Sequence, residues 1–163
     1  MKVALFIGSD SDFDIAKGAV DIFKEFGISF QLEVTSAHRS PERTKNLVSD
    51  LEKQGAQIFI AVAGKAAHLA GVVASHTQKP VIGVPVGSAG LSGLDALLST
   101  VQMPRGIPVA CMGIGKSGAV NAALLAVEIL SLKDPSIAEQ IAIYREQMEE
   151  KVKEASDKIK ERI

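Results

Sequence analysis

Apolar and polar positions follow two different patterns along this chain. Short runs of consecutive apolar residues predict buried parallel strands. The segments between them carry apolar residues every three or four positions, which predicts amphipathic helices. The predicted strands are 3–7, 29–34, 57–62, 81–84 and 107–112, and the predicted helices are 13–26, 41–54, a short helix containing His68, 94–102, 119–132 and 134–163.

The regular alternation of strands and helices predicts an α/β fold. We expect a three-layer, doubly wound parallel sheet of five strands with helices on both faces. The flavodoxin-like strand order 2-1-3-4-5 is the topology we expect. The sequence contains no linker, repeat or low-complexity stretch, so we expect one domain over residues 1–163.

The last predicted helix, 134–163, has an unusually long apolar stripe. A helix of about 30 residues spans about 45 Å, which exceeds the width of a domain of this size. We therefore expect part of it to pack on neighbouring subunits of a homo-oligomer. The stripe consists of Ile137, Ile141, Tyr144, Met148, Val152, Ala155 and Ile159.

Composition narrows the classes of partner. With 163 residues, of which 47% are hydrophobic, the chain is large enough to bury a core. A formal net charge of −1 gives no electrostatic footprint for nucleic acid or an anionic membrane surface. No run is long enough to span a bilayer. Cys111 is the only cysteine, which fits the reducing cytoplasm, and its apolar surroundings predict a buried, inert thiol.

The most reactive side chains stand together in the segment Glu33–Pro41. His38 and Arg39 follow a predicted strand, and Ser40 and Pro41 are typical of the N-cap and first position of a helix. Both therefore lie on a loop at the carboxyl edge of the sheet, where ligands bind in this class of fold.

Two further loops are expected at the same edge. Gly8–Asp12 offers serine hydroxyls and free amides at a helix N-terminus, which suits an anion. Asp12 is a candidate to cap the helix, to accept hydrogen bonds from a ribose diol, or to do both. Small residues in Ala63–His68 let the flat face of a ligand approach the backbone, and His68 is either a second acid/base or a structural histidine. Together the loops suit a ribonucleotide monophosphate with a proton shuttle above its base.

Other nucleotide signatures fit less well. The glycines of Gly113–Gly118 match the dinucleotide fingerprint, but the acidic residue that should end a following strand is missing because no strand follows. A flavin module would need more aromatic residues than this chain has. Asp10, Asp12 and Asp14 do not point at one ion from a helix start, so we expect no metal. A non-catalytic nucleotide-binding module stays open.

Six stretches of the chain are familiar as an ordered set: Gly8–Asp12, Ser36–Pro41, Ala63–Leu69, Pro80–Pro85, Leu94–Pro104 and Asn121–Ala126. Over essentially its whole length the chain resembles the PurE family. Its members are N5-carboxyaminoimidazole ribonucleotide mutases, also named phosphoribosylaminoimidazole carboxylase catalytic subunits, and the class I type is the better match.

The resemblance implies a reaction and a site. The family moves a carboxylate from N5 to C4 of an aminoimidazole ribonucleotide in purine biosynthesis, with CO2 as a bound intermediate and without a cofactor, and it assembles as a homo-octamer. It implies that His38 is the general acid/base, that Arg39 binds the phosphate and that Asp12 holds the ribose hydroxyls. It further implies that Ser9 and Ser11 lie by the phosphate-binding loop, and that Gly64, Ala66 and His68 line the pocket around the migrating carboxylate. Ser36, which precedes His38 on its loop, is a further substrate-binding residue.

Elementary chemistry supports the role of His38. Loss of the carbamate from N5 needs a proton there, and carboxylation at C4 must be followed by loss of the C4 proton. One imidazole that titrates near the operating pH can do both in turn. Released CO2 needs a closable cavity, for which Gly87–Gly93 is a candidate lid.

Two positions depart from the family pattern. Lys65 stands where a second glycine is usual, and Ala70 where proline is common. A lysine in the pocket would hold CO2 or bicarbonate by charge, which makes direct carboxylation of aminoimidazole ribonucleotide the alternative activity; a Lys65 that points to solvent has no such role. The Ser36–Arg39 and Ala66–Leu69 segments follow the mutase class, which we therefore prefer.

Overall fold

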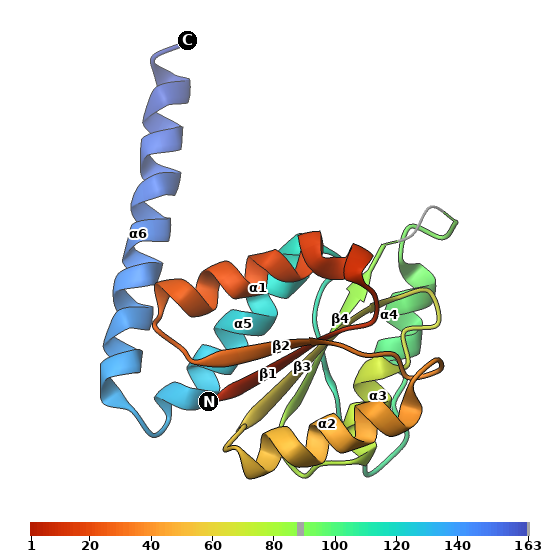
Figure 1. Ribbon diagram of the computed structural model, residues 1–163. Coiled ribbons are helices and arrows are strands. Elements are labelled where there is room, and N and C mark those ends of the chain that lie inside the picture. The colour runs from red at the N-terminus through yellow and green to blue at the C-terminus, as the bar shows by residue number, and fades with distance from the viewer. Residues whose placement is uncertain (88–89, 163) are drawn as a thin grey trace. The chain divides into compact units, whose positions relative to one another are not determined.

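The computed structural model describes residues 1–87 and 90–162. The chain forms two compact units, Met1–Ala126 and Val127–Ile163. The first contains the sheet and the loops at its carboxyl edge, and the second contains the C-terminal helix (Figure 1).

The sheet has the predicted topology. Its five strands are all parallel and run in the order β2-β1-β3-β4-β5, so the flavodoxin-like prediction is confirmed. Their bounds are β1 (Val3–Ile7), β2 (Phe30–Val34), β3 (Ile58–Gly64), β4 (Val81–Val86) and β5 (Ala110–Cys111).

The edge strand β5 is shorter than predicted. It pairs with β4 only through Ala110 and Cys111, whereas the apolar run predicted a strand over 107–112. Pro108 has no backbone N–H to donate to the ladder, which explains the late start. Cys111 is half-buried rather than buried, and its burial raises the pKa of the thiol, which keeps it protonated and unreactive.

The helices match the predicted pattern, with two shifts at their starts. The short helix begins at Leu69, so His68 stands at its N-cap position rather than inside it, and the fifth helix begins at Lys116 rather than Ala119. The helical bounds are η1 (Asp10–Asp12), α1 (Phe13–Glu25), α2 (Pro41–Lys53), α3 (Leu69–Ser75), α4 (Leu94–Val101), α5 (Lys116–Ser131) and α6 (Pro135–Lys160).

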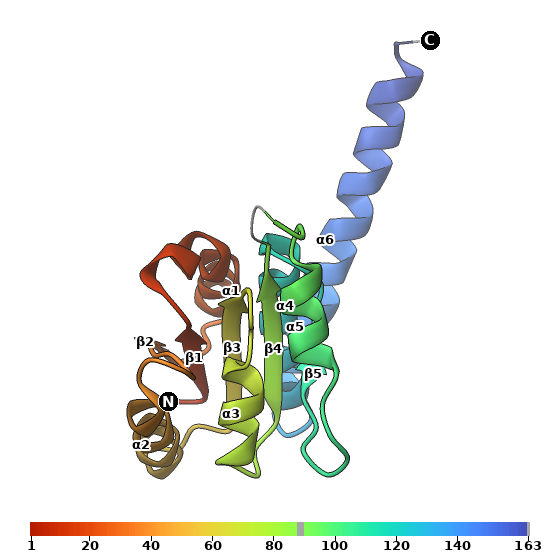
Figure 2. The same cartoon turned by 90° about the vertical axis from the view of Figure 1, so that its right-hand side faces the viewer.

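Side chains that alternate along the central strands build a core on each face of the sheet. Phe6 of β1 and Phe59 of β3 stack with ring centroids 5.9 Å apart on the face covered by α2, α3 and α4. Leu5 and Ile60 point to the other face, which α1 and the first part of α5 cover (Figures 1 and 2). Strands β1 and β3 are thus held on both sides, and their carboxyl ends form a fixed platform.

In the second unit, α6 begins as predicted. The Asp134 carboxylate accepts a hydrogen bond from the Ser136 backbone N–H at 3.2 Å, which caps the helix. Along the apolar stripe, Met148, Val152 and Ile159 are 51%, 72% and 55% exposed. Among the described residues, no helix combines the length and the apolar character needed to cross a membrane.

Candidate active site

A cavity of about 710 Å³ opens at the carboxyl edge of the sheet. Its volume falls in the range of small-molecule sites. Four segments line it, namely the loops that follow β1, β2 and β3 and the end of β4. The lining residues are Gly8, Ser9, Ser11, Asp12, Ser36, Ala37, His38, Arg39, Ala63, Gly64, Lys65, Ala66, Leu69, Val86 and Gly87.

The loop after β1 carries hydroxyl and amide donors. Gly8 extends the sheet, with its N–H 2.9 Å from the Val62 carbonyl oxygen. The Asp10 carboxylate accepts from the Ser9 hydroxyl at 2.9 Å and from the Ser11 N–H at 3.0 Å. These two bonds, the Ser9 bond first, hold the pKa of Asp10 below its usual value. Ser9 and Ser11 line the cavity, but Asp10 satisfies donors that an anionic ligand would use.

Asp12 is nearly buried at the cavity wall. It occupies the N-cap position of α1, yet its side chain makes no capping hydrogen bond, so of the two predicted roles the cap is not made. Burial raises the pKa of the Asp12 carboxyl, while the nearby charge of Arg39 acts in the opposite direction. Asp12 lines the cavity, and its carboxyl group accepts a hydrogen bond from the backbone of Ser9, which acts to lower the pKa.

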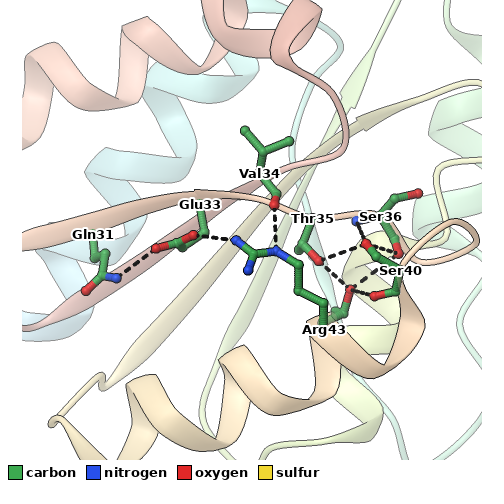
Figure 3. Close-up of polar contacts among 8 residues, drawn as sticks. Gln31, Glu33, Val34, Thr35, Ser36, Ser40 and Arg43 are labelled. Atoms are coloured by element: carbon green, nitrogen blue, oxygen red, sulfur yellow. Dashed lines mark hydrogen bonds and ion pairs between the residues drawn. The ribbon is translucent and has the colours of Figure 1, made fainter.

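The loop after β2 rests on a network of hydroxyl groups (Figure 3). Thr35 and Thr44 are buried, and their Oγ1 atoms lie 2.8 Å apart. The Ser40 hydroxyl accepts from the Ser36 N–H at 3.0 Å and donates to the Ser36 carbonyl at 3.3 Å. Ser40 stands at the N-cap of α2 as predicted, but its side chain bonds to this loop rather than to the helix.

An ion pair ties the same loop to the sheet. Arg43, in α2, binds the Glu33 carboxylate of β2 at 2.8 Å and donates from Nε to the Val34 carbonyl oxygen at 3.3 Å (Figure 3). The turn that carries His38 and Arg39 is thus anchored at both ends, which positions both side chains.

His38 and Arg39 reach toward different neighbouring loops. Arg39 Nη2 donates to the Gly8 carbonyl oxygen of the β1 loop at 3.2 Å. His38 Nε2 lies 2.8 Å from Nδ1 of His68 at the end of the β3 loop, with the rings edge to face. The pair of residues predicted as the centre of the site therefore connects all three loops.

The loop after β3 places a cation at the cavity. Gly64, Lys65 and Ala66 line it as predicted, and Lys65 has a left-handed backbone with φ of 55°. Two tight turns follow, with the Ala67 N–H 2.8 Å from the Lys65 carbonyl oxygen and the His68 N–H 2.8 Å from that of Ala66. Unlike the other predicted site residues, His68 does not itself line the cavity and acts on it through His38.

Sequence reasoning missed the contribution of β4. Val86 and Gly87 close one side of the cavity, and Leu69 adds an apolar surface. The signal was present, because β4 is a parallel strand whose carboxyl end must lie at the same edge. In the predicted lid, Gly87–Gly93, residues 88 and 89 lie outside the described residues.

Two glycines of the apparent dinucleotide fingerprint are required by the local structure, Gly118 by a close contact and Gly115 by its backbone conformation. A Cβ on Gly118 would lie 1.6 Å from the Gly113 carbonyl oxygen, and Gly115 has φ of 80°. Among the described residues, none of the three lines the cavity. Within the same part of the chain, no cluster of three or more His, Cys, Asp or Glu side chains is placed to hold a metal ion.

Comparison with known proteins identifies the family. A family model described as AIR carboxylase matches residues 2–151. The chain belongs to this family. The N5-carboxyaminoimidazole ribonucleotide mutase of Methanocaldococcus jannaschii is 55% identical to this AIR carboxylase family member over 159 residues, which cover 98% of each chain.

Further relatives extend the match. The enzyme of the same name from Escherichia coli strain K12 is 46% identical over 156 residues, 96% of this chain and 92% of its own. The crystal structure of Treponema denticola PurE superposes with a TM-score of 0.86 at 31% identity and covers 96% of each chain. The resemblance to the PurE family is therefore confirmed.

Proposed function

We propose that this AIR carboxylase family member is an N5-carboxyaminoimidazole ribonucleotide mutase of de novo purine biosynthesis. It converts N5-carboxyaminoimidazole ribonucleotide to 4-carboxy-5-aminoimidazole ribonucleotide and is thus an isomerase. The observation that carries the proposal is the position of His38, which lines a ligand-sized cavity between one loop rich in hydroxyl donors and another rich in small residues. Relatives that bear this enzyme name match nearly the whole chain.

The ribonucleotide is held at the β1 side of the cavity in this proposal. Arg39 lies against the β1 loop and supplies the charge for the phosphate. Ser9 and Ser11 are additional donors once the phosphate takes the place of the Asp10 carboxylate to which they are bonded. Asp12, whose carboxylate makes no cap, accepts hydrogen bonds from the ribose hydroxyls. The base then extends toward the β2 and β3 loops, where His38 lies.

His38 performs both proton transfers. It donates a proton to N5 as the bond from N5 to the carboxyl carbon breaks and CO2 leaves. CO2 then forms a bond to C4, and the imidazole removes the C4 proton, so the reaction is a balanced isomerisation. Ser36, Gly64 and Ala66 surround the migrating group, and the apolar side chains of Leu69 and Val86 help to keep water from CO2.

The proposed steps use acid–base chemistry and binding, and they call for no cofactor or metal. We further propose that the enzyme works in the cytoplasm as a homo-octamer. The single free cysteine fits a reducing compartment. The exposed apolar stripe of α6 offers a surface for neighbouring subunits.

The decisive test compares two substrate mixtures with the purified wild-type protein. We expect turnover of the N5-carboxylated ribonucleotide without added bicarbonate, and little turnover of uncarboxylated aminoimidazole ribonucleotide with bicarbonate. A protein that uses only the second mixture is a direct carboxylase, and that result overturns the mutase proposal. The names of the relatives favour the first outcome.

A further inference from the structure

Two cationic side chains, Arg39 and Lys65, line the cavity, and they differ in the contacts that they make. Arg39 donates to the Gly8 carbonyl oxygen, and its charge acts on the carboxyl groups of Asp10 and Asp12. Lys65 lines the same cavity but forms no ion pair within 4.0 Å with any described residue.

The backbone places Lys65 on the proton-transfer side of the cavity. It directly follows Gly64, which pairs with Val86 at the end of β4. Two tight turns lead from Lys65 to His68, which is bonded to His38. The lysine is thus on the loop that contacts the catalytic imidazole, whereas Arg39 contacts the loop of the proposed phosphate site.

The conformation of Lys65 is itself unusual. A φ of 55° is a left-handed backbone, which glycine or asparagine adopts more readily than lysine. A residue held in such a conformation at a ligand cavity points to a functional constraint. Glycine would fit this backbone better, but the residue at this position is a lysine, which adds a positive charge. We therefore look for an electrostatic role of the Lys65 side chain.

We infer that Lys65 binds the carboxylate that the ribonucleotide carries at N5 in the substrate and at C4 in the product. This inference rests on the proposed function. A carboxylated ribonucleotide has two anionic groups, and the cavity is lined by two cationic side chains that come from different loops. Arg39 suits the phosphate and Lys65 suits the carboxylate.

The chemistry of the reaction defines what such a lysine can do. The carboxylate is an anion in substrate and product, but the CO2 intermediate is neutral, so the ion pair is lost between them. Lys65 therefore stabilises the two bound ground states rather than the reacting centre. Interactions of that kind set affinity and leave kcat unchanged or lower it, so Lys65 selects carboxylated over uncarboxylated ribonucleotide.

The test measures binding of two ligands that differ only in the carboxylate. Calorimetry gives Kd for 4-carboxy-5-aminoimidazole ribonucleotide and for aminoimidazole ribonucleotide with wild type, Lys65→Gln and Lys65→Arg. Lys24→Gln in α1, a lysine that does not line the cavity, is the matched control. Lys65→Gly relaxes the left-handed backbone and serves as a second neutral variant, and thermal melting establishes that each variant is folded.

We expect Lys65→Gln and Lys65→Gly to weaken binding of the carboxylated ligand about five- to tenfold. A loss of this size is typical when one partly exposed ion pair with a charged hydrogen bond is removed. Affinity for the uncarboxylated ligand should stay within about twofold of wild type. Because the lost ion pair stabilised only the bound ground state, kcat should be unchanged or higher. Lys65→Arg should bind like wild type, and added salt should narrow the difference in affinity between wild type and the neutral variants. Equal weakening of both ligands places Lys65 at the phosphate or ribose, and unchanged affinity places it in solvent; either result overturns the inference. Failure of the wild type to turn over the N5-carboxylated substrate overturns the proposed function instead, since the binding comparison does not depend on turnover.

Discussion

His38 Nε2 lies 2.8 Å from His68 Nδ1, which joins two loops that are 30 residues apart in the sequence. One proton serves this contact, and which ring carries it depends on the tautomer. His68 does not line the cavity, so its influence passes through the orientation of the His38 ring. The contact occupies one nitrogen of His38 and thereby restrains the orientation of its imidazole at the cavity.

Removing this contact tests its positioning role. His68→Phe keeps an aromatic ring but loses the nitrogen, and we expect kcat to fall about ten- to hundredfold because a misplaced acid/base is inefficient. KM should change far less. Steady-state kinetics separate the two parameters, and His76→Phe, at the far end of α3, is the matched control. An unchanged kcat in His68→Phe contradicts a positioning role.

The buried hydroxyl pair beneath the β2 loop gives a prediction on stability. Thr44→Val keeps the shape of the side chain but leaves the buried Thr35 hydroxyl without its 2.8 Å partner. We expect a loss of about 1–3 kcal/mol in the free energy of unfolding, measured by urea denaturation. Thr44→Ser retains the hydroxyl and should lose less. If Thr44→Val unfolds at the same urea concentration as wild type, the hydrogen bond between Thr35 and Thr44 does not stabilise the fold.

Asp12 gives a prediction on pH. Burial raises its pKa above 3.8, so as pH falls this carboxyl takes up a proton earlier than an ordinary aspartate does. The advantage of wild type over Asp12→Asn in ribonucleotide affinity should therefore be largest near neutral pH and disappear as pH falls through the raised pKa. Calorimetry between pH 7 and pH 4 gives the ratio of the Kd of Asp12→Asn to the Kd of wild type. Titration of the ligand phosphate affects both proteins equally and cancels in this ratio. A ratio that does not change with pH contradicts a role for the ionised carboxylate.

The same shift predicts the sign of a stability effect. A carboxyl whose pKa is raised in the folded protein favours folding while it is protonated, and that contribution is lost as pH rises through the folded-state pKa. At pH 7 the buried Asp12 carboxylate therefore opposes folding. We expect Asp12→Asn to unfold at a higher urea concentration than wild type at pH 7, and a lower midpoint contradicts the effect of burial.

Periodicity was sufficient to predict the sheet, because runs such as Val3–Ile7 and Ile58–Gly64 are buried on both faces of a parallel sheet. Periodicity predicted β5 to be longer than it is, because an apolar pattern carries no information about the missing backbone N–H of Pro108. Local rules also predicted a helix cap at Ser40 and allowed one at Asp12, beside a ribose-binding role. The Ser40 hydroxyl bonds to Ser36 instead, while Asp12 makes no cap.

The candidate site was predictable in outline and not in detail. Loops after parallel strands share one edge, so Ser9, His38 and Gly64 could be brought together from sequence. The contact between His38 and His68 depends on the conformations of two separate loops, which no local pattern specifies. The left-handed Lys65 backbone was likewise hidden, because a lysine gives no signal of positive φ.

The C-terminal helix gives a prediction on assembly. Val152 is 72% exposed and Ile159 55% exposed on the apolar stripe of α6. Deletion of residues 149–163 should lower the order of the proposed oligomer, because it removes the apolar surface that we propose neighbouring subunits bury. Light scattering measures the mass, and Lys158→Ala, which keeps the stripe, is the control. An unchanged mass after the deletion contradicts a role for this part of α6 in assembly.

The role of His38 is tested best by the turnover of the N5-carboxylated ribonucleotide by His38→Asn, recorded together with the affinity of this variant for the ribonucleotide. We predict that carboxylate transfer falls by about 10²- to 10⁴-fold because the group that exchanges protons with N5 and C4 is gone. Affinity should stay within about tenfold of wild type, since Arg39 and Asp12 still hold the ribonucleotide. Turnover near the wild-type rate contradicts the assignment of His38 as the acid/base.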